Sequence, residues 1–190
     1  MFQNPAVAVL ELKSIARGFR VADTMVKKAH VELVKVHPIC PGKFIIMIMG
    51  EVDPVDEAMH AGIVDAGDLL VAEMFLPYAH RGIIPALTGS VFNVEWQSVA
   101  IVESFSVACA FKALDISLKR SAVQAIDMRL ANGLGGKAYY ILNGSLDQIQ
   151  SATEIATTFL QEEGALVITE IIAAPHAEFL LKGINGPLSY

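Results

Sequence analysis

The chain repeats itself, and this internal duplication constrains its fold more than any other feature. Val9-Leu10-Glu11 recurs as Ile101-Val102-Glu103, a shift of 92 positions. Other pairs follow the same shift, and later pairs follow it after two slips of two positions each. These pairs are Ser14 with Ser106, Ala16 with Ala108, Asp23 with Asp115, Lys27 with Lys119, Val31 with Val123, Gly42-Lys43 with Gly136-Lys137, Gly50 with Gly144, Ala58 with Ala152, and His80 with His176. An ordered series of this kind indicates two copies of one module of about ninety residues.

Each copy carries the same order of expected elements. Alternating apolar positions predict strands, and apolar residues at helical spacing predict helices. In the first copy we expect strands at 6–12, 31–39, 43–50 and 69–76, with helices at 15–28, 54–68 and 81–87. In the second copy we expect strands at 98–104, 123–131, 137–143 and 165–172, with helices at 106–120 and 146–161. The helix at 15–28 places Ile15, Phe19, Ala22 and Val26 on one face.

The order strand-helix-strand-strand-helix-strand predicts a split βαβ, ferredoxin-like fold. This is an α+β fold, an α/β sandwich in which helices cover one face of an antiparallel sheet. The segment 87–97, with Gly89, Ser90 and Asn93, is the expected linker. We therefore expect one domain at residues 1–88 and a second at 97–186. The other face of each sheet needs cover, and neighbouring subunits are one source of it.

Composition excludes several classes of protein. The chain has 190 residues, of which 54% are hydrophobic and 18% charged, so it is not a disordered chain. Its longest uncharged stretch, 82–94, is too short to span a bilayer, and no leader peptide is expected. A net charge of -6 argues against a nucleic-acid partner. Two cysteines predict a reducing cytoplasm, and the apolar excess predicts a large subunit interface.

A glycine-rich loop at 132–137 invites comparison with a phosphate-binding loop. Its Gly133, Gly135 and Gly136 precede Lys137, but Ala138 follows where a Ser or Thr is needed. The loop also leads into a strand, so no helix N-terminus faces a bound anion. We therefore expect no nucleotide here. The glycines more simply indicate a backbone that a symmetry mate approaches closely.

The remaining polar residues show no pattern of an active site, and we expect no enzyme. The five histidines lack the spacing of metal ligands, and no serine nucleophile elbow occurs. Carboxylates at equivalent positions in both copies are expected to be structural, as are His80 and His176. The residues concerned are His30, His37, His60, His80 and His176, Glu11 with Glu103, and Asp23 with Asp115.

The two cysteines differ in their surroundings. Cys109 lies in an apolar helix, where we expect a small buried side chain. Cys40 lies in the turn at 38–43, and exposed turns are poor places for an idle thiol. Lys43 and the amides around Gly42 favour a thiolate there. One thiolate per chain cannot hold an iron–sulfur cluster, which needs three or four, but three chains around a threefold axis can.

The residues at 11–34 resemble the opening of a bacterial microcompartment shell domain. The acidic end of the first strand, the Ala-Asp-x-Met-x-Lys helix and the Val-Glu-Leu-Val strand carry the likeness. The closing pairs Ala79-His80 and Pro175-His176 continue it. The resemblance covers residues 6–176 and occurs twice in unpermuted order, so it is to a tandem-domain shell protein.

The turn at 39–44 is similar to that of the propanediol-utilisation tandem shell proteins. Those proteins are trimers whose central turn cysteines bind a 4Fe–4S cluster on the threefold axis. The resemblance implies Cys40 as the cluster ligand, supported by Lys43. It also implies a cytoplasmic shell, a homotrimer that forms a pseudohexamer, and other shell proteins as partners. The pore-lining residues it implies are Pro38, Ile39, Pro41, Gly42, Lys43, Asn132, Gly133, Leu134, Gly135 and Gly136.

The resemblance leaves functional alternatives open. Family tiles pack edge to edge through a helix-end lysine, which implies Lys27 and Lys119 here. The family's arginine just before the closing Pro-His pair is replaced by Tyr78 and Ala174, so this edge contact departs from the usual pattern. A cluster could pass electrons across the shell or only plug the pore. The alternatives are a metal-free metabolite pore and a regulatory module that binds a small molecule between its two domains.

Overall fold

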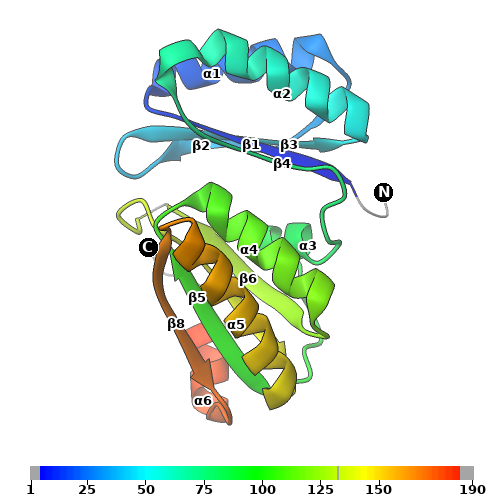
Figure 1. Cartoon of the computed structure of the whole chain (residues 1–190), viewed down its shortest axis with the longest axis vertical. Coiled ribbons are helices and arrows are strands. Elements are labelled where there is room, and N and C mark those ends of the chain that lie inside the picture. The colour runs from blue at the N-terminus through cyan, green and yellow to red at the C-terminus, as the bar shows by residue number, and fades with distance from the viewer. Residues whose placement is uncertain (1–4, 132, 185–190) are drawn as a thin grey trace.

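The protein folds into two similar modules joined by a short segment (Figure 1). The structure, a computed structural model, describes residues 5–131 and 133–184. The first module contains β1 (Ala6–Leu12), α1 (Ile15–Lys28), β2 (Glu32–Ile39), β3 (Lys43–Gly50), α2 (Val52–Ala66), η1 (Gly67–Leu69), β4 (Leu70–Leu76) and α3 (Ile83–Thr88). The second contains β5 (Ser98–Ser104), α4 (Val107–Arg120), β6 (Gln124–Leu130), β7 (Ala138–Gly144), α5 (Leu146–Glu162), β8 (Leu166–Ile172), α6 (Ala177–Phe179) and η2 (Leu180–Ile184). The predicted α+β fold is confirmed.

The two sheets share topology and register. Their strand orders are β2-β3-β1-β4 and β6-β7-β5-β8, and every pairing is antiparallel. Glu11 lies opposite Ile45, and its counterpart Glu103 lies opposite Tyr139. A register shift directly follows Glu11 in one sheet and Glu103 in the other. The repetition of such a local irregularity shows that the duplication extends to backbone detail.

The first helix of each module begins at an equivalent serine. The Ser14 hydroxyl accepts a hydrogen bond from the Arg17 amide at 3.3 Å, and the Ser106 hydroxyl accepts one from the Cys109 amide at 3.2 Å. Serine caps of this kind satisfy an amide that has no partner within the helix. Both helices end on two basic residues, which the helix dipole favours at that end.

Both faces of the first sheet are covered within the chain. Helices α1 and α2 lie on one face, and the helices of the second module lie against the other (Figure 1). The second sheet has its own helices on one face, but its opposite face is only partly covered, by Val91, Val94, Trp96 and Ile184. The cover expected from neighbouring subunits thus comes, for the first sheet, from the second half of the same chain.

Helix α1 carries two apolar faces. The face that packs on its own sheet differs from the face predicted from the apolar spacing. The residues buried against its own sheet are Gly18, Val21, Ala22 and Met25. Of the predicted apolar face, Ile15, Phe19 and Val26 are 40%, 57% and 37% exposed. A helix with a second apolar face has a second surface to bury, and nothing within the described residues covers this one fully.

The expected linker is partly helical. Leu87 and Thr88 belong to α3, and Leu87 is buried between the modules, so the irregular segment is 89–97. Among the described residues, no helix combines the length and apolarity needed to cross a bilayer.

Candidate functional site

Two hairpin tips at equivalent positions of the modules lie side by side. The first joins β2 to β3 and contains Cys40, and the second joins β6 to β7 over residues 131–137 (Figure 1). The Cys40 amide donates a hydrogen bond to the Ala131 carbonyl at 3.1 Å. The Ala131 amide in turn donates to the Lys137 carbonyl at 2.8 Å, which closes the second tip beneath the first.

Gly136 leaves no room for a side chain between the tips. A Cβ atom on this residue would lie 3.2 Å from both the Cys40 carbonyl oxygen and Pro41 Cδ. Its φ of +89° also favours glycine. The expected close approach to the glycine loop therefore comes from the first module of the same chain, because the duplication brings the two tips together.

A lysine and a glutamate pair at the base of each tip. Lys43 Nζ lies 3.1 Å from Glu11 Oε2, and Lys137 Nζ lies 2.6 Å from Glu103 Oε1. The Glu11 side chain is 4% exposed and that of Glu103 is 26% exposed, because only Glu11 lies beneath the other module. Lys43 therefore neutralises a buried carboxylate, and its charge is not free to act on the thiol alone.

The thiol of Cys40 is unpaired and partly buried in this tip. Pro38, Pro41 and Gly42 are exposed around it. Ile39, predicted to line a pore, is 4% exposed and packs in the core between the modules, because it ends a strand that the second module covers. In the second tip, Gly133 and Gly135 are exposed and Leu134 and Gly136 partly so, while Asn132 lies outside the described residues.

The part of the chain that the structure describes holds no group of three His, Cys, Asp or Glu side chains able to bind a metal. One chain thus brings a single thiol to the tips. Cys109, expected to be a small buried side chain, is partly exposed on α4, where it packs at the margin of the core.

The two lysines predicted at tile edges each pair with an aspartate one turn earlier. Lys27 Nζ lies 2.5 Å from Asp23 Oδ2, and Lys119 Nζ lies 2.6 Å from Asp115 Oδ2. Both lysines remain accessible, with side chains 72% and 44% exposed. Asp115 is buried, because its other carboxylate oxygen accepts the His80 amide from the first module at 2.8 Å.

His80 and His176 cap the turns that follow β4 and β8. The His80 Nδ1 atom accepts a hydrogen bond from the Gly82 amide at 3.1 Å, and His176 Nδ1 accepts one from the Glu178 amide at 3.2 Å. Each ring nitrogen therefore acts as an acceptor in the neutral imidazole. The equivalent contacts show a structural role at both positions.

His80 gives the seam between the modules a pH dependence. Burial lowers the pKa of His80, with Arg81 and Lys119 acting in the same direction and Asp115 opposing them. A histidine with a lowered pKa in the folded state favours folding above its unfolded pKa of about 6.5 and loses that contribution as the pH falls. We expect the urea midpoint to fall between pH values of about 7.5 and 5.5, and to fall less in His80→Asn, which keeps an acceptor. His30→Asn, at an exposed site, serves as the control; an equal fall in both variants would contradict the assignment.

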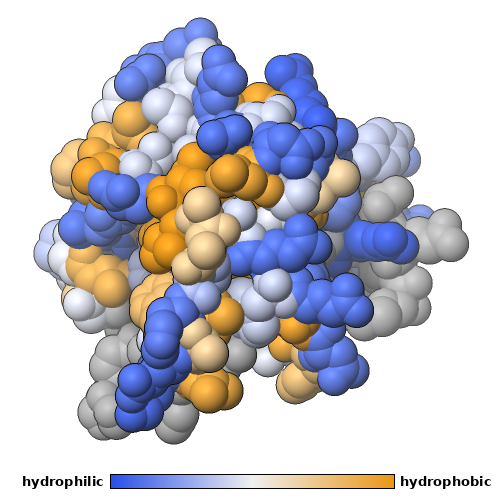
Figure 2. All heavy atoms as spheres, turned by 90° about the horizontal axis from the view of Figure 1, so that it is seen from below, coloured by the Kyte–Doolittle hydropathy of each residue, from blue (hydrophilic) through white to orange (hydrophobic). Residues whose placement is uncertain are grey.

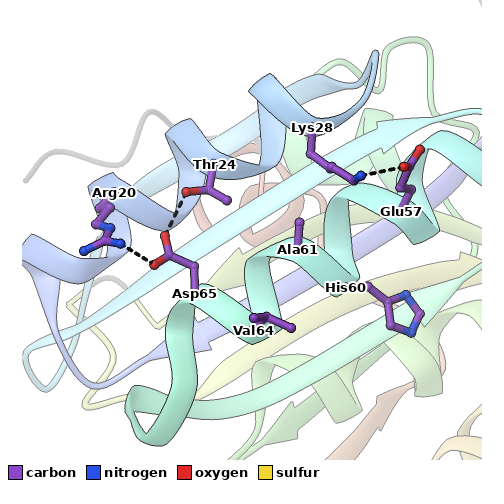
Figure 3. A pocket seen from close by; sticks show the side chains of 8 residues that line it. All are labelled: Arg20, Thr24, Lys28, Glu57, His60, Ala61, Val64 and Asp65. Atoms are coloured by element: carbon purple, nitrogen blue, oxygen red, sulfur yellow. Dashed lines mark hydrogen bonds and ion pairs between the residues drawn. The ribbon is translucent and has the colours of Figure 1, made fainter.

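A groove of about 650 Å³ runs between α1 and α2 (Figure 3). Its charged groups are paired across the two helices. Arg20 Nη2 lies 3.1 Å from Asp65 Oδ1, and Lys28 Nζ lies 2.8 Å from Glu57 Oε1. Thr24 donates to the other Asp65 oxygen at 2.8 Å. These ion pairs and the hydrogen bond therefore hold the two helices together. The charged groups that line the groove bind each other and are not left unpaired for a ligand.

Comparison with known proteins finds the same tandem architecture. The BMC domain family matches residues 6–79 and 98–175. The bacterial microcompartment shell protein PduT of Citrobacter freundii is 37% identical over 183 residues, which cover 96% of this chain and 100% of that protein. The carboxysome shell protein CsoS1A of Hydrogenovibrio crunogenus is 32% identical over 87 residues, 44% of this chain and 90% of that one.

Two solved structures share the fold over most of the chain. A microcompartment protein from Desulfitobacterium hafniense DCB matches with a TM-score of 0.88 at 31% identity, over 93% of this chain and 98% of that one. The double ringed trimeric shell protein MSM0271 of the RMM microcompartment matches with a TM-score of 0.63 at 14% identity, over 85% of each chain.

Proposed function

Since this chain belongs to the BMC domain family and is a tandem-domain structural protein of a bacterial microcompartment shell, we propose that three copies close into a pseudohexagonal tile with a 4Fe–4S cluster on its axis. The observation that carries the proposal is the seam between the modules. This seam serves as a template for the contact between one chain and the next.

The template consists of one helix of the second module packed on the open face of the first sheet. Helix α4 contributes Val107, Phe111, Leu114 and Leu118, which are at most 6% exposed. The first sheet contributes the buried residues Val7, Val9, Ile45 and Met47. These residues form one continuous apolar core, without the converging polar groups that a ligand site between the domains needs.

Subtracting the repeat shift of 92 from the α4 residues gives Ile15, Phe19, Ala22 and Val26 of α1. These are the residues of the second apolar face, and three of them are exposed. The face that is buried within the chain on α4 is therefore exposed on α1. A second copy of the chain offers the surface that fits it.

The matching surface is the open face of the second sheet. Val9 and Ile45 of the first sheet correspond to Ile101 and Tyr139 here, both partly exposed. Ile168 on β8 is 51% exposed on the same face, since it pairs with Glu103. Viewed from the end that carries this module, the surface shows apolar patches among charged groups (Figure 2).

Repetition of one contact, alternately within and between chains, gives a head-to-tail arrangement. Such contacts close into a ring when the rotation divides a full turn. In the proposed tile six modules form the ring, and three chains supply them. In a sixfold ring, equivalent points of adjacent modules lie as far from each other as from the axis.

That geometry supports an axial position for the tips. Ala131 is the counterpart of Ile39. Its carbonyl accepts a hydrogen bond from the amide of Cys40, the residue that follows Ile39. Equivalent points that nearly touch belong close to the axis. Three copies of the Cys40 thiol would converge there, although one chain alone supplies too few ligands.

The donor set fits a shared cluster, since Cys40 is a free thiol in a tip whose exposed residues are small or cyclic. A bound 4Fe–4S cluster supplies one-electron transfer, here between the two sides of a shell. The Ala131 carbonyl of the second tip holds the Cys40 backbone, and the Lys43–Glu11 pair holds the base of the first tip.

Iron analysis and sedimentation after anaerobic purification test the proposal. We expect brown trimers with about four irons per three chains. Cys40→Ser should give colourless trimers without iron, since it removes the only thiol at the tips. Cys109→Ser is the matched control and should keep both colour and iron. A wild-type trimer that stays iron-free after anaerobic reconstitution would support the metal-free pore instead, and a stable monomer would contradict the tile.

A further inference from the structure

Gly136, in the glycine loop of the second module, has no side chain, yet it lies against Cys40, the proposed cluster ligand of the first module. We propose that Gly136 is a positioning residue that fixes the place and exposure of the Cys40 thiol. The relevance to iron rests on the proposed function, whereas the contact itself does not.

Three contacts define this arrangement. The Cys40 amide is bonded to the Ala131 carbonyl at 3.1 Å, and Ala131 is bonded back to Lys137 at 2.8 Å. Ala131 has a φ of +46°, which is uncommon for a residue with a side chain and is held by these bonds. Gly136 then lies directly against the Cys40 carbonyl and Pro41. The backbone on both sides of the thiol is thus fixed by the second module.

Gly135 offers a comparison for Gly136, because it also has a positive φ but does not approach the first tip. Gly135 and Gly136 both have positive φ, +61° and +89°. A Cβ at Gly136 would meet the first tip at 3.2 Å, whereas one at Gly135 would meet nothing within 4 Å among the described residues. An alanine at either position meets a positive φ, which lies within the left-handed α region at Gly135 and beyond it at Gly136. Only the alanine at Gly136 also pushes on Cys40.

The duplication explains why the contact occurs once in each chain. Gly42, the counterpart of Gly136, has nothing within 4 Å of its built Cβ in the described chain. Within one chain the first tip therefore rests on the second, and the second tip supports it.

The rate at which Cys40 reacts with a disulfide reagent tests the inference in iron-free protein. A Cys109→Ser background leaves Cys40 as the reporting thiol. We expect Gly136→Ala to raise this rate about fivefold, because even modest overpacking populates states in which the tip is displaced. Gly136→Val should raise it further, and Gly135→Ala should leave it within about twofold of the starting protein.

Two further measurements keep this inference separate from the proposed function. Sedimentation shows whether each variant keeps the assembly of the starting protein. After reconstitution, Gly136→Ala should hold less iron than Gly135→Ala. If the wild type binds no iron, the cluster proposal fails while the thiol rates still decide the role of Gly136. Equal rates for the Gly135 and Gly136 alanine variants would overturn that role, whether both rise or neither does.

Discussion

Replacing Phe19 with glutamate should convert the proposed trimer into folded single chains of 20.4 kDa. Phe19 is 57% exposed in the chain, so the substitution removes little from the core of its own module. Its counterpart Phe111 is fully buried in the seam, and the proposed ring buries Phe19 in the same way. A carboxylate left unpaired there costs several kcal/mol at each of three contacts.

Sedimentation across a range of concentrations measures the effect. Circular dichroism on the same samples should show unchanged secondary structure. Within the chain, Phe19 loses a tilted ring contact with Phe44, whose ring centroid lies 4.8 Å away. Such a pair contributes about 0.5–1.5 kcal/mol, which the module can lose and still fold.

Val64→Glu is the matched control. Val64 is an apolar residue on α2 with 82% exposure, and it lies outside the α1 face. Its counterpart by the repeat is Thr158, already a polar residue. The control should remain trimeric. A Phe19→Glu protein that also stays trimeric would show that the chains meet through another surface.

The sequence predicted the fold well, because the repeat supplied every pattern twice. Strand alternation and helix caps are local signals, and β1, α1, β3 and β5 begin and end at the predicted residues. The likeness to a tandem-domain shell protein is confirmed over nearly the whole chain. The family of the chain could therefore be predicted from its residues alone.

Contacts between the modules could not be predicted in this way. Periodicity showed that Phe19 and Ile15 share an apolar face, but the choice of inward face on α1 depends on which residues fit the sheet. Gly18 can approach Phe44 closely and therefore turns inward. In the same way, three glycines in a loop indicate a close approach without identifying the partner, which here is Cys40. The assignment of Cys40 as a cluster ligand stays a prediction.

The two modules solve the same packing problem with different side chains. Gly18 faces Phe44 in the first module, whereas the equivalent positions in the second hold Ala110 and Ala138. All four residues are buried. A large residue on the strand thus occurs with glycine on the helix, and a small one occurs with alanine.

Gly18→Ala should therefore lower the free energy of unfolding by about 2–3 kcal/mol. The new Cβ would overlap the Phe44 ring and lie 2.8 Å from its Cβ, so a rigid group close to the backbone must move. This cost outweighs the gain of up to about 1 kcal/mol that alanine brings to a helix interior. Urea unfolding at one fixed protein concentration measures the change, since assembly adds to apparent stability.

Gly62→Ala on α2 is the matched control. Its Cβ would also meet neighbours at 2.8 Å, but these are Leu10 Cδ1 and Met25 Cγ and Sδ, atoms of flexible side chains rather than of a rigid ring. The control should therefore lose less than about 1 kcal/mol. The equivalent pair in the second module, Ser117 and Ala156, already has the smaller partner and the extra methyl group.

The sign of the effect should reverse once the ring is removed. Phe44→Ala alone should cost about 3–5 kcal/mol, because it leaves a cavity beneath α1. Adding Gly18→Ala to that variant recreates the pair found in the second module, fills part of the cavity and favours the helix. The double variant should then be more stable than Phe44→Ala. If Gly18→Ala destabilises both backgrounds equally, the cost lies in the helix backbone and not in contact with the ring.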